Sequence, residues 1–228
     1  MKKILIAMLS VAALCAGAKT PSDLVAEFNA KASAPTDWAA AAKIASDNSA
    51  DVAAAISVWA ADANITKPES ELTAEQHKNA QAARMIAGQY LTANPSQIKT
   101  LPLRFACFVI SSKVFDEFSA DNPNFYADLK AADFKVDGKP LPANSVIQIA
   151  LAAGDTDYVA QMPVRVAASS PRYVGAMADW LLAQSDVAAA LKKAQSIESY
   201  YITSGREVPT KLKAVLTALT RRLVTSKI

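Results

Sequence analysis

Histidine, the side chain most often used as a catalytic base or metal ligand, is almost missing from this sequence. His77 is the only histidine among the 228 residues. One histidine excludes a histidine-rich metal site and leaves at most one Ser-His-Asp arrangement. Its neighbours in 75–79 are all polar, so we interpret His77 as a surface residue rather than a catalytic base.

Cys107 is the candidate nucleophile, because a thiolate attacks carbonyl and disulfide groups. Its neighbours Phe105, Ala106 and Phe108 are apolar, and the local pattern contains no basic partner. A thiol in such surroundings has a raised pKa and is unreactive. We therefore predict that Cys107 is a core residue.

The sequence contains no recognisable phosphate-binding, nucleophile-elbow or calcium-binding motif. The six glycines are scattered, so neither a phosphate-binding loop nor a nucleophile elbow is present. Asp121-Asn122-Pro123-Asn124 and Asp155-Thr156-Asp157 contain possible oxygen ligands. They lack the alternating ligands and terminal Glu of a calcium loop, so we interpret both as helix-capping turns. We expect no metal and no cofactor. Acid–base catalysis by two carboxylates distant in sequence remains open.

The first 18 residues have the three parts of a secretory signal peptide. Two lysines follow Met1, residues 4–14 are apolar apart from Ser10, and Ala16-Gly17-Ala18 provides the small residues that signal peptidase requires. We expect cleavage between Ala18 and Lys19 and a periplasmic or secreted protein. Lipidation at Cys15 is the alternative, which the bulky Leu14 before it disfavours.

The net charge gives no reason to expect a nucleic-acid partner. Cleavage would remove Lys2 and Lys3, leaving 22 basic against 21 acidic side chains and a formal net charge of +1. Cys107 would then be the only cysteine, so no intramolecular disulfide is expected.

Composition and periodicity predict an all-α fold. Alanine, the best helix former, makes up about a fifth of the chain. An apolar stripe at helical spacing runs from Leu103 to Phe118, and we predict a central helix over about 102–118. The other predicted helices are short and closely spaced, which favours antiparallel hairpins in one domain over 19–228. The polar, proline-containing stretch 65–72 is a candidate hinge.

One segment breaks the helical pattern and supplies our candidate binding residues. Residues 134–141 predict a small β-hairpin with Asp137-Gly138 as its turn. The nearby Phe125 and Tyr126 are aromatic, and irregular loops on a rigid scaffold often bind ligands. We therefore select Phe125, Tyr126, Asp137 and Gly138. The alternative is that this excursion only covers one end of the core.

The C-terminal helix, predicted over 211–224, has a compact apolar stripe with basic residues beside it. We expect the stripe to dock on the protein. Membrane contact is the alternative, disfavoured by the missing aromatic anchors. The stripe comprises Leu212, Val215, Leu216, Leu219 and Leu223.

These features together predict an exported, soluble helical binding or scaffold protein of the cell envelope, with a protein partner or self-association. A periplasmic hydrolase that uses carboxylates is the first alternative. A carrier of a small apolar ligand in the helical core is the second. Two convergent carboxylates in a deep pocket would favour the hydrolase, whereas an apolar groove would favour the binding protein.

Overall fold

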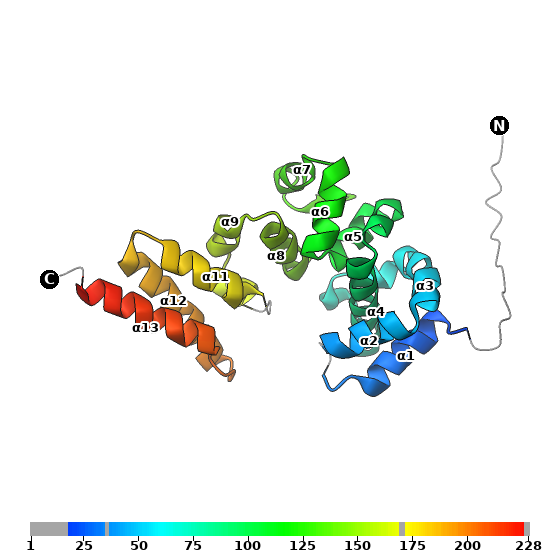
Figure 1. Ribbon diagram of the computed structural model, residues 1–228, viewed down its shortest axis with the longest axis horizontal. Helices are drawn as coiled ribbons and strands as arrows, with labels where there is room; N and C mark the ends of the chain where they lie inside the picture. The colour runs from blue at the N-terminus through cyan, green and yellow to red at the C-terminus, as the bar shows by residue number, and fades with distance from the viewer. Residues whose placement is uncertain (1–17, 35–36, 169–171, 226–228) are drawn as a thin grey trace.

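The computed structural model describes residues 18–34, 37–168 and 172–225. The predicted signal peptide, with Cys15, therefore lies outside the described residues except for Ala18. The described chain is helical apart from one two-stranded sheet, which confirms the predicted all-α class. Figure 1 shows the helices as an elongated series of short hairpins, with the N-terminal and C-terminal groups at opposite ends. None of the described helices is both long and apolar enough to cross a bilayer.

The first four α-helices form one end of the molecule. They are α1 (Pro21–Lys31), α2 (Trp38–Asp47), α3 (Ser49–Ala61) and α4 (Ala74–Ala93). A capping box starts α4, in which Thr73 and Gln76 exchange hydrogen bonds between side chain and backbone. Helix α4 contacts each of the other three, and its many alanines allow close approach. It is therefore the centre of this group (Figure 1).

We predicted one continuous helix over about 102–118. The structure has two helices there, so that prediction was wrong. The segments are η3 (Pro95–Thr100), α5 (Leu103–Val109) and α6 (Ser112–Asp121). Ile110 is extended between α5 and α6, with φ −65° and ψ 133°, and the Ser111 hydroxyl caps α6. Serine hydroxyls compete with the helical backbone for hydrogen bonds and favour cap positions. The break follows from this cap, which the apolar periodicity alone did not reveal.

The predicted hinge at 65–72 is held by two arginines. It contains the end of η1 (Ala63–Thr66) and all of η2 (Glu69–Glu71), both 3-10 helices. Arg84 donates to the carbonyls of Ile65 at 2.6 Å and Lys67 at 3.0 Å, and Arg104 donates to that of Thr66 at 3.1 Å. These bonds tie the segment to α4 and α5. Its role as a hinge stays a prediction.

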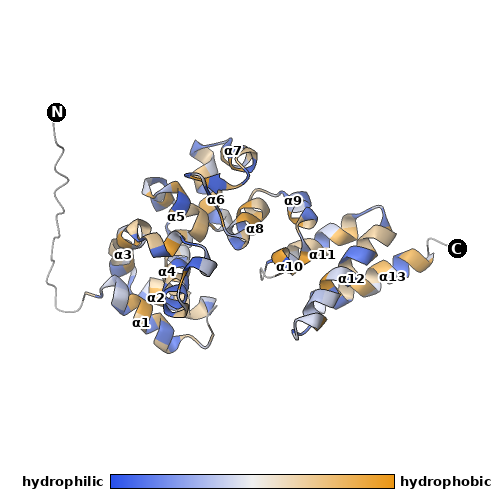
Figure 2. Cartoon of the chain, turned by 180° about the vertical axis from the view of Figure 1, so that it is seen from behind, coloured by the Kyte–Doolittle hydropathy of each residue, from blue (hydrophilic) through white to orange (hydrophobic). Residues whose placement is uncertain are grey.

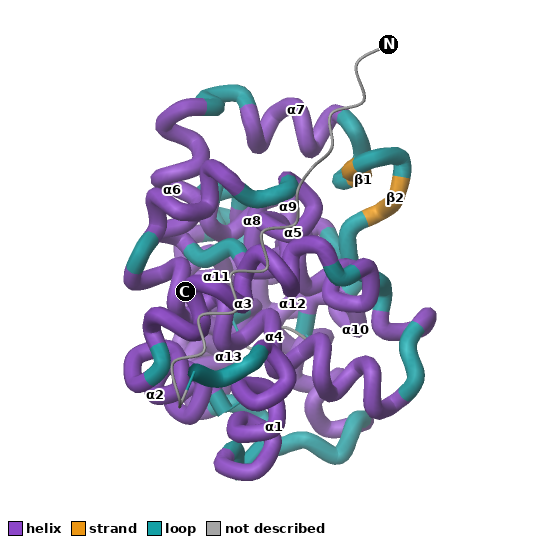
Figure 3. The backbone as a smooth tube through the Cα atoms, turned by 90° about the vertical axis from the view of Figure 1, so that its right-hand side faces the viewer, coloured by secondary structure: helices purple, strands orange, loops and turns teal. Residues whose placement is uncertain are grey.

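The predicted β-hairpin is present. After α7 (Phe125–Ala131), strand β1 (Lys135–Val136) pairs antiparallel with β2 (Lys139–Pro140). Asp137 and Gly138 both have positive φ, 54° and 72°, as a type I′ turn requires. Figure 3 shows the two strands at one end of the chain's helical body, next to α7. Phe134, Val136 and Leu141 are buried in the first core, so the excursion covers that core.

The remaining helices build a second core. They are α8 (Ala143–Ala152), α9 (Thr156–Gln161), α10 (Val164–Ala167), α11 (Tyr173–Ala183), α12 (Val187–Thr203) and α13 (Thr210–Thr225). Hydrophobic residues recur along each of α11 to α13 among hydrophilic ones, as Figure 2 shows. Leu212, Val215 and Leu219 of α13 are buried against this group, so the C-terminal helix docks as expected.

Helix α8 belongs to both cores. Val146 and Ile149 pack in the first, whereas Ile147 and Ala150 pack in the second. Figure 1 places α8 between the two helical groups. Because one helix supplies side chains to both, the two cores are joined through its adjacent faces.

A polar contact beside α8 strengthens this junction. The Tyr126 hydroxyl of α7 donates to the Asp155 carboxylate at 2.8 Å, and the Lys130 ammonium approaches the same oxygen at 2.5 Å. The other carboxylate oxygen accepts from the N–H of Tyr158 and caps α9. Burial alone would raise the pKa of Asp155. These three partners outweigh burial, however, and lower that pKa below its usual value.

The docking of α13 predicts a large cost for shortening one of its buried leucines. Leu219 is fully buried, whereas Val224 on the same helix is 58% exposed. We expect Leu219→Ala to lower the free energy of unfolding by about 2–5 kcal/mol, because a cavity remains in the second core. The matched control Val224→Ala should change it by no more than about 0.5 kcal/mol. Urea unfolding measures both, and equal effects would contradict the docked arrangement.

The Asp155 contact predicts a pH-dependent contribution to stability. A carboxyl whose pKa is lowered by folding stabilises the protein above its unfolded pKa of about 3.9. That contribution is lost as the pH falls through the lower, folded-state pKa. We therefore expect Asp155→Asn to destabilise the protein at pH 7, and the difference from wild type to shrink towards pH 3. Urea unfolding at several pH values measures this, with the exposed Asp116→Asn as control. A pH-independent difference would contradict the prediction.

Candidate functional site

The four candidate binding residues from the sequence do not lie together. The buried Phe125 packs on α6, with its ring centroid 4.7 Å from that of Phe118. Tyr126 faces Asp155 instead, and Asp137 and Gly138 are exposed at the hairpin turn. A binding role for these residues stays a prediction. The described residues also contain no group of three or more His, Cys, Asp or Glu side chains placed to hold a metal ion.

A different region contains the candidate site, a groove where α4, α5 and α8 meet. We call it the α4–α8 groove, and its volume is about 280 Å³. It is partly enclosed, with α2 and the start of α11 at its edges. Its lining residues are Trp38, Gln81, Arg84, Met85, Gly88, Gln89, Thr92, Cys107, Phe108, Val109, Ile110, Ser111, Pro142, Asn144, Ser145, Gln148 and Arg172.

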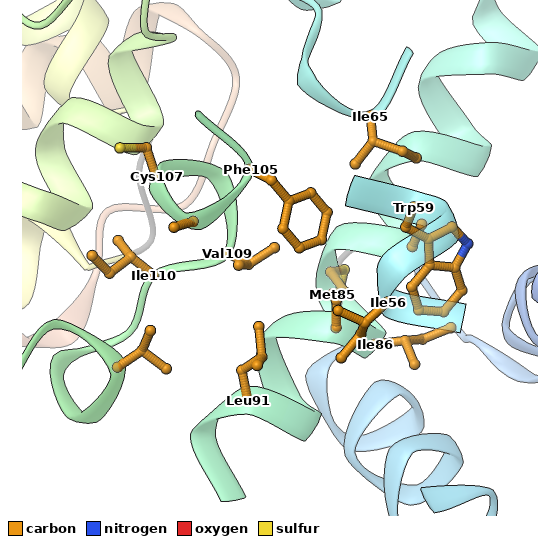
Figure 4. Close-up of a cluster of buried hydrophobic side chains, with 14 of the residues drawn as sticks. Ile56, Trp59, Ile65, Met85, Ile86, Leu91, Phe105, Cys107, Val109 and Ile110 are labelled. Carbon is orange, nitrogen blue, oxygen red and sulfur yellow. The ribbon is translucent and has the colours of Figure 1, made fainter. Parts of the chain in front are cut away.

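The apolar part of the groove depends on the break between α5 and α6. Gly88 of α4 allows the backbone of α5 to come close, since a Cβ there would lie 3.4 Å from the Val109 carbonyl oxygen. The chain then turns away at Ile110 and leaves space between α4 and α8. Figure 4 shows Phe105 and Val109 pointing towards the core around Met85, whereas Cys107 points to the other side of α5.

The polar part of the groove includes several groups that have no partner among the described residues. Ser145 is the one buried polar residue in the described part of the chain, at 8% exposure. Neither its hydroxyl nor the amides of Gln81, Gln89 and Gln148 form a hydrogen bond with any described residue. The three amides are half-buried and line the groove with donors and acceptors that are not used within the described chain. Unpaired groups that face a groove are therefore candidates to bind a ligand.

The charges in the groove are of one sign. Arg84 lies over the Phe108 ring, 4.5 Å from its centroid, and donates to backbone carbonyls. Arg172 is exposed at the start of α11. The described lining residues include no Asp, Glu or His. The groove therefore favours neutral or negatively charged groups.

The sequence alone did not identify this site, because its residues come from five separate segments. One signal was present in α4, where Gln81, Gly88, Gln89 and Thr92 recur on one side of an otherwise alanine-rich helix. Polar residues and a glycine at helical spacing indicate a face with a neighbour or a ligand. Apolar periodicity, which located the cores, cannot detect such a face.

The position of Cys107 predicts an unreactive thiol. Its side chain is buried, and this burial raises the pKa of Cys107 to about 12. In a Cys15→Ser background, we expect the folded protein to react slowly with a disulfide reagent at pH 8 and the urea-unfolded protein to react rapidly. Cys107→Ala should cost on the order of 1 kcal/mol of stability. Rapid labelling of the folded protein would contradict a core position.

The groove thus combines an apolar floor, unpaired polar groups and positive charge. No family model, no curated protein and no solved structure matches this chain. What the groove can bind follows from its own side chains.

Proposed function

We propose that this chain is a non-enzymatic binding protein of the cell envelope and that its ligand occupies the α4–α8 groove. The observation that carries the proposal is the set of unpaired polar groups around an apolar floor. Ligand sites have this composition, since a few polar groups fix orientation and the apolar surface supplies binding energy. Export rests on the signal-peptide pattern of residues 1–18. A protein partner or self-association stays a prediction.

The chemistry of the lining supports binding over hydrolysis. A hydrolase of the kind considered from the sequence needs two convergent carboxylates. The described residues around the groove supply amides, hydroxyls and arginines instead. Cys107 is the one thiol among the described lining residues, and its raised pKa opposes a nucleophilic role.

The volume of the groove suits a small ligand or a single side chain of a partner protein. About 280 Å³ lies near the lower end of the range for small-molecule sites. Trp38, 47% exposed at the edge, offers further aromatic surface to whatever enters. A groove of this kind fits both the binding protein and the small-ligand carrier that the sequence suggests.

The test uses a neutral fluorescent probe, N-phenyl-1-naphthylamine, whose emission rises in an apolar site. Gln148 is half-buried in the groove, and Gln161 is exposed at the end of α9. We expect Gln148→Trp to fill part of the groove and weaken probe binding by about tenfold, equivalent to 1.4 kcal/mol. The matched control Gln161→Trp should leave the affinity within about twofold of wild type.

Thermal unfolding followed by circular dichroism establishes that both variants are folded. No saturable probe binding to wild type, or equal affinities for the two variants, would overturn the groove as the ligand site.

A further inference from the structure

We infer that the ligand of the α4–α8 groove is a small amphipathic anion, with its charged group at the first turn of α8 and its apolar part on the groove floor. The inference rests on the proposed function and names the class of ligand. It depends on three features: free donors in α8, the unpaired hydroxyl of the buried residue Ser145, and positive charge in a groove whose described lining includes no Asp or Glu.

The first turn of α8 offers free hydrogen-bond donors. Pro142 precedes the helix and provides no side-chain cap, and the first backbone bond runs from the N–H of Val146 to the Pro142 carbonyl. The N–H groups of Ala143 and Ser145 form no hydrogen bond with any described residue. Such donors, together with the partial positive charge of a helix start, favour an anion.

Ser145 is an independent indication of a ligand at the same place. Its side chain lines the groove, is more than nine-tenths buried, and its hydroxyl has no hydrogen-bond partner among the described residues. The fully buried unpaired oxygens of the described residues are those of Ser119 and Tyr173, so the Ser145 oxygen keeps some accessible surface on the groove side of an otherwise buried residue. An acceptor oxygen of a bound ligand can take the place of water at this hydroxyl.

The surrounding charge selects an anion over a neutral acceptor. Arg172 is exposed at the edge of the groove, and the Arg84 guanidinium lies against Phe108 on its wall. Helix α6 also starts at the groove, at Ser111. No described lining residue carries a negative charge to oppose them. In a partly closed site, these positive groups attract an anion more strongly than in open water.

The floor requires that the ligand also be apolar. Met85, Phe108, Val109 and Ile110 line the groove beside the polar groups, and all except Phe108 are buried. An inorganic anion would leave this surface in contact with water. A carboxylate, sulfonate or phosphate on a hydrocarbon or aromatic body matches both parts of the site.

The test compares two probes of similar shape that differ in charge. They are the sulfonate 8-anilinonaphthalene-1-sulfonate and the neutral N-phenyl-1-naphthylamine. Wild type should bind the sulfonate more tightly than the neutral probe, and increasing salt should weaken only the sulfonate. Gln148→Glu places a carboxylate in the groove without changing side-chain size. We expect it to lower sulfonate affinity by tenfold or more and neutral-probe affinity by less than about twofold.

Two further variants complete the design. Gln161→Glu makes the same charge change on the exposed end of α9 and should leave both affinities unchanged. Arg172→Gln, at an exposed position, should weaken the sulfonate alone. If Gln148→Glu affects both probes equally, the anion inference fails while the groove remains a ligand site. If wild type does not bind the neutral probe, or Gln148→Trp leaves neutral-probe binding unchanged, the proposed function itself fails.

Discussion

Two guanidinium groups lie over the Phe108 ring, and the same two arginines fix backbone segments that are far apart in sequence. Arg84 of α4 is 4.5 Å from the ring centroid and Arg104 of α5 is 5.7 Å from it. Both arginines donate hydrogen bonds to backbone carbonyls. A guanidinium suits this use, because its planar face stacks on an aromatic ring while its edge donates several hydrogen bonds.

The carbonyls that accept these bonds belong to segments far apart in sequence. Arg84 reaches the 65–67 stretch, and Arg104 reaches Thr66, Lys139 and Pro140. The connection after α3 and the β-hairpin are thereby fixed to α4 and α5. The short 3-10 turn and the two-residue strand satisfy only some of their backbone groups internally, so the remaining carbonyls need partners elsewhere. The two arginines supply them, and the same stacking places Phe108 on the wall of the groove.

The groove itself results from two interruptions of regular packing. Gly88 allows α5 to approach α4 closely, and the turn at Ile110 then moves the chain away before α6 begins. Helix α8 closes the other side and carries the unpaired Ser145. Because α8 also packs into the second core, and Arg172 starts α11, both halves of the molecule contribute to one site.

Much of the architecture was determined by local sequence. Alanine content and apolar periodicity indicated an all-helical chain, and the Asp137-Gly138 turn and the docked stripe of α13 appear as predicted. These features depend on residues close together in the chain, whose conformations follow from propensity and spacing. The break at Ile110–Ser111 was missed because two apolar helices in sequence have the same periodicity as one. The groove was decided by tertiary structure alone, since Trp38, Gln81, Ser145 and Arg172 meet only when separate helices pack. Whether a polar side chain forms a hydrogen bond depends on neighbours from other helices, which the local sequence does not predict.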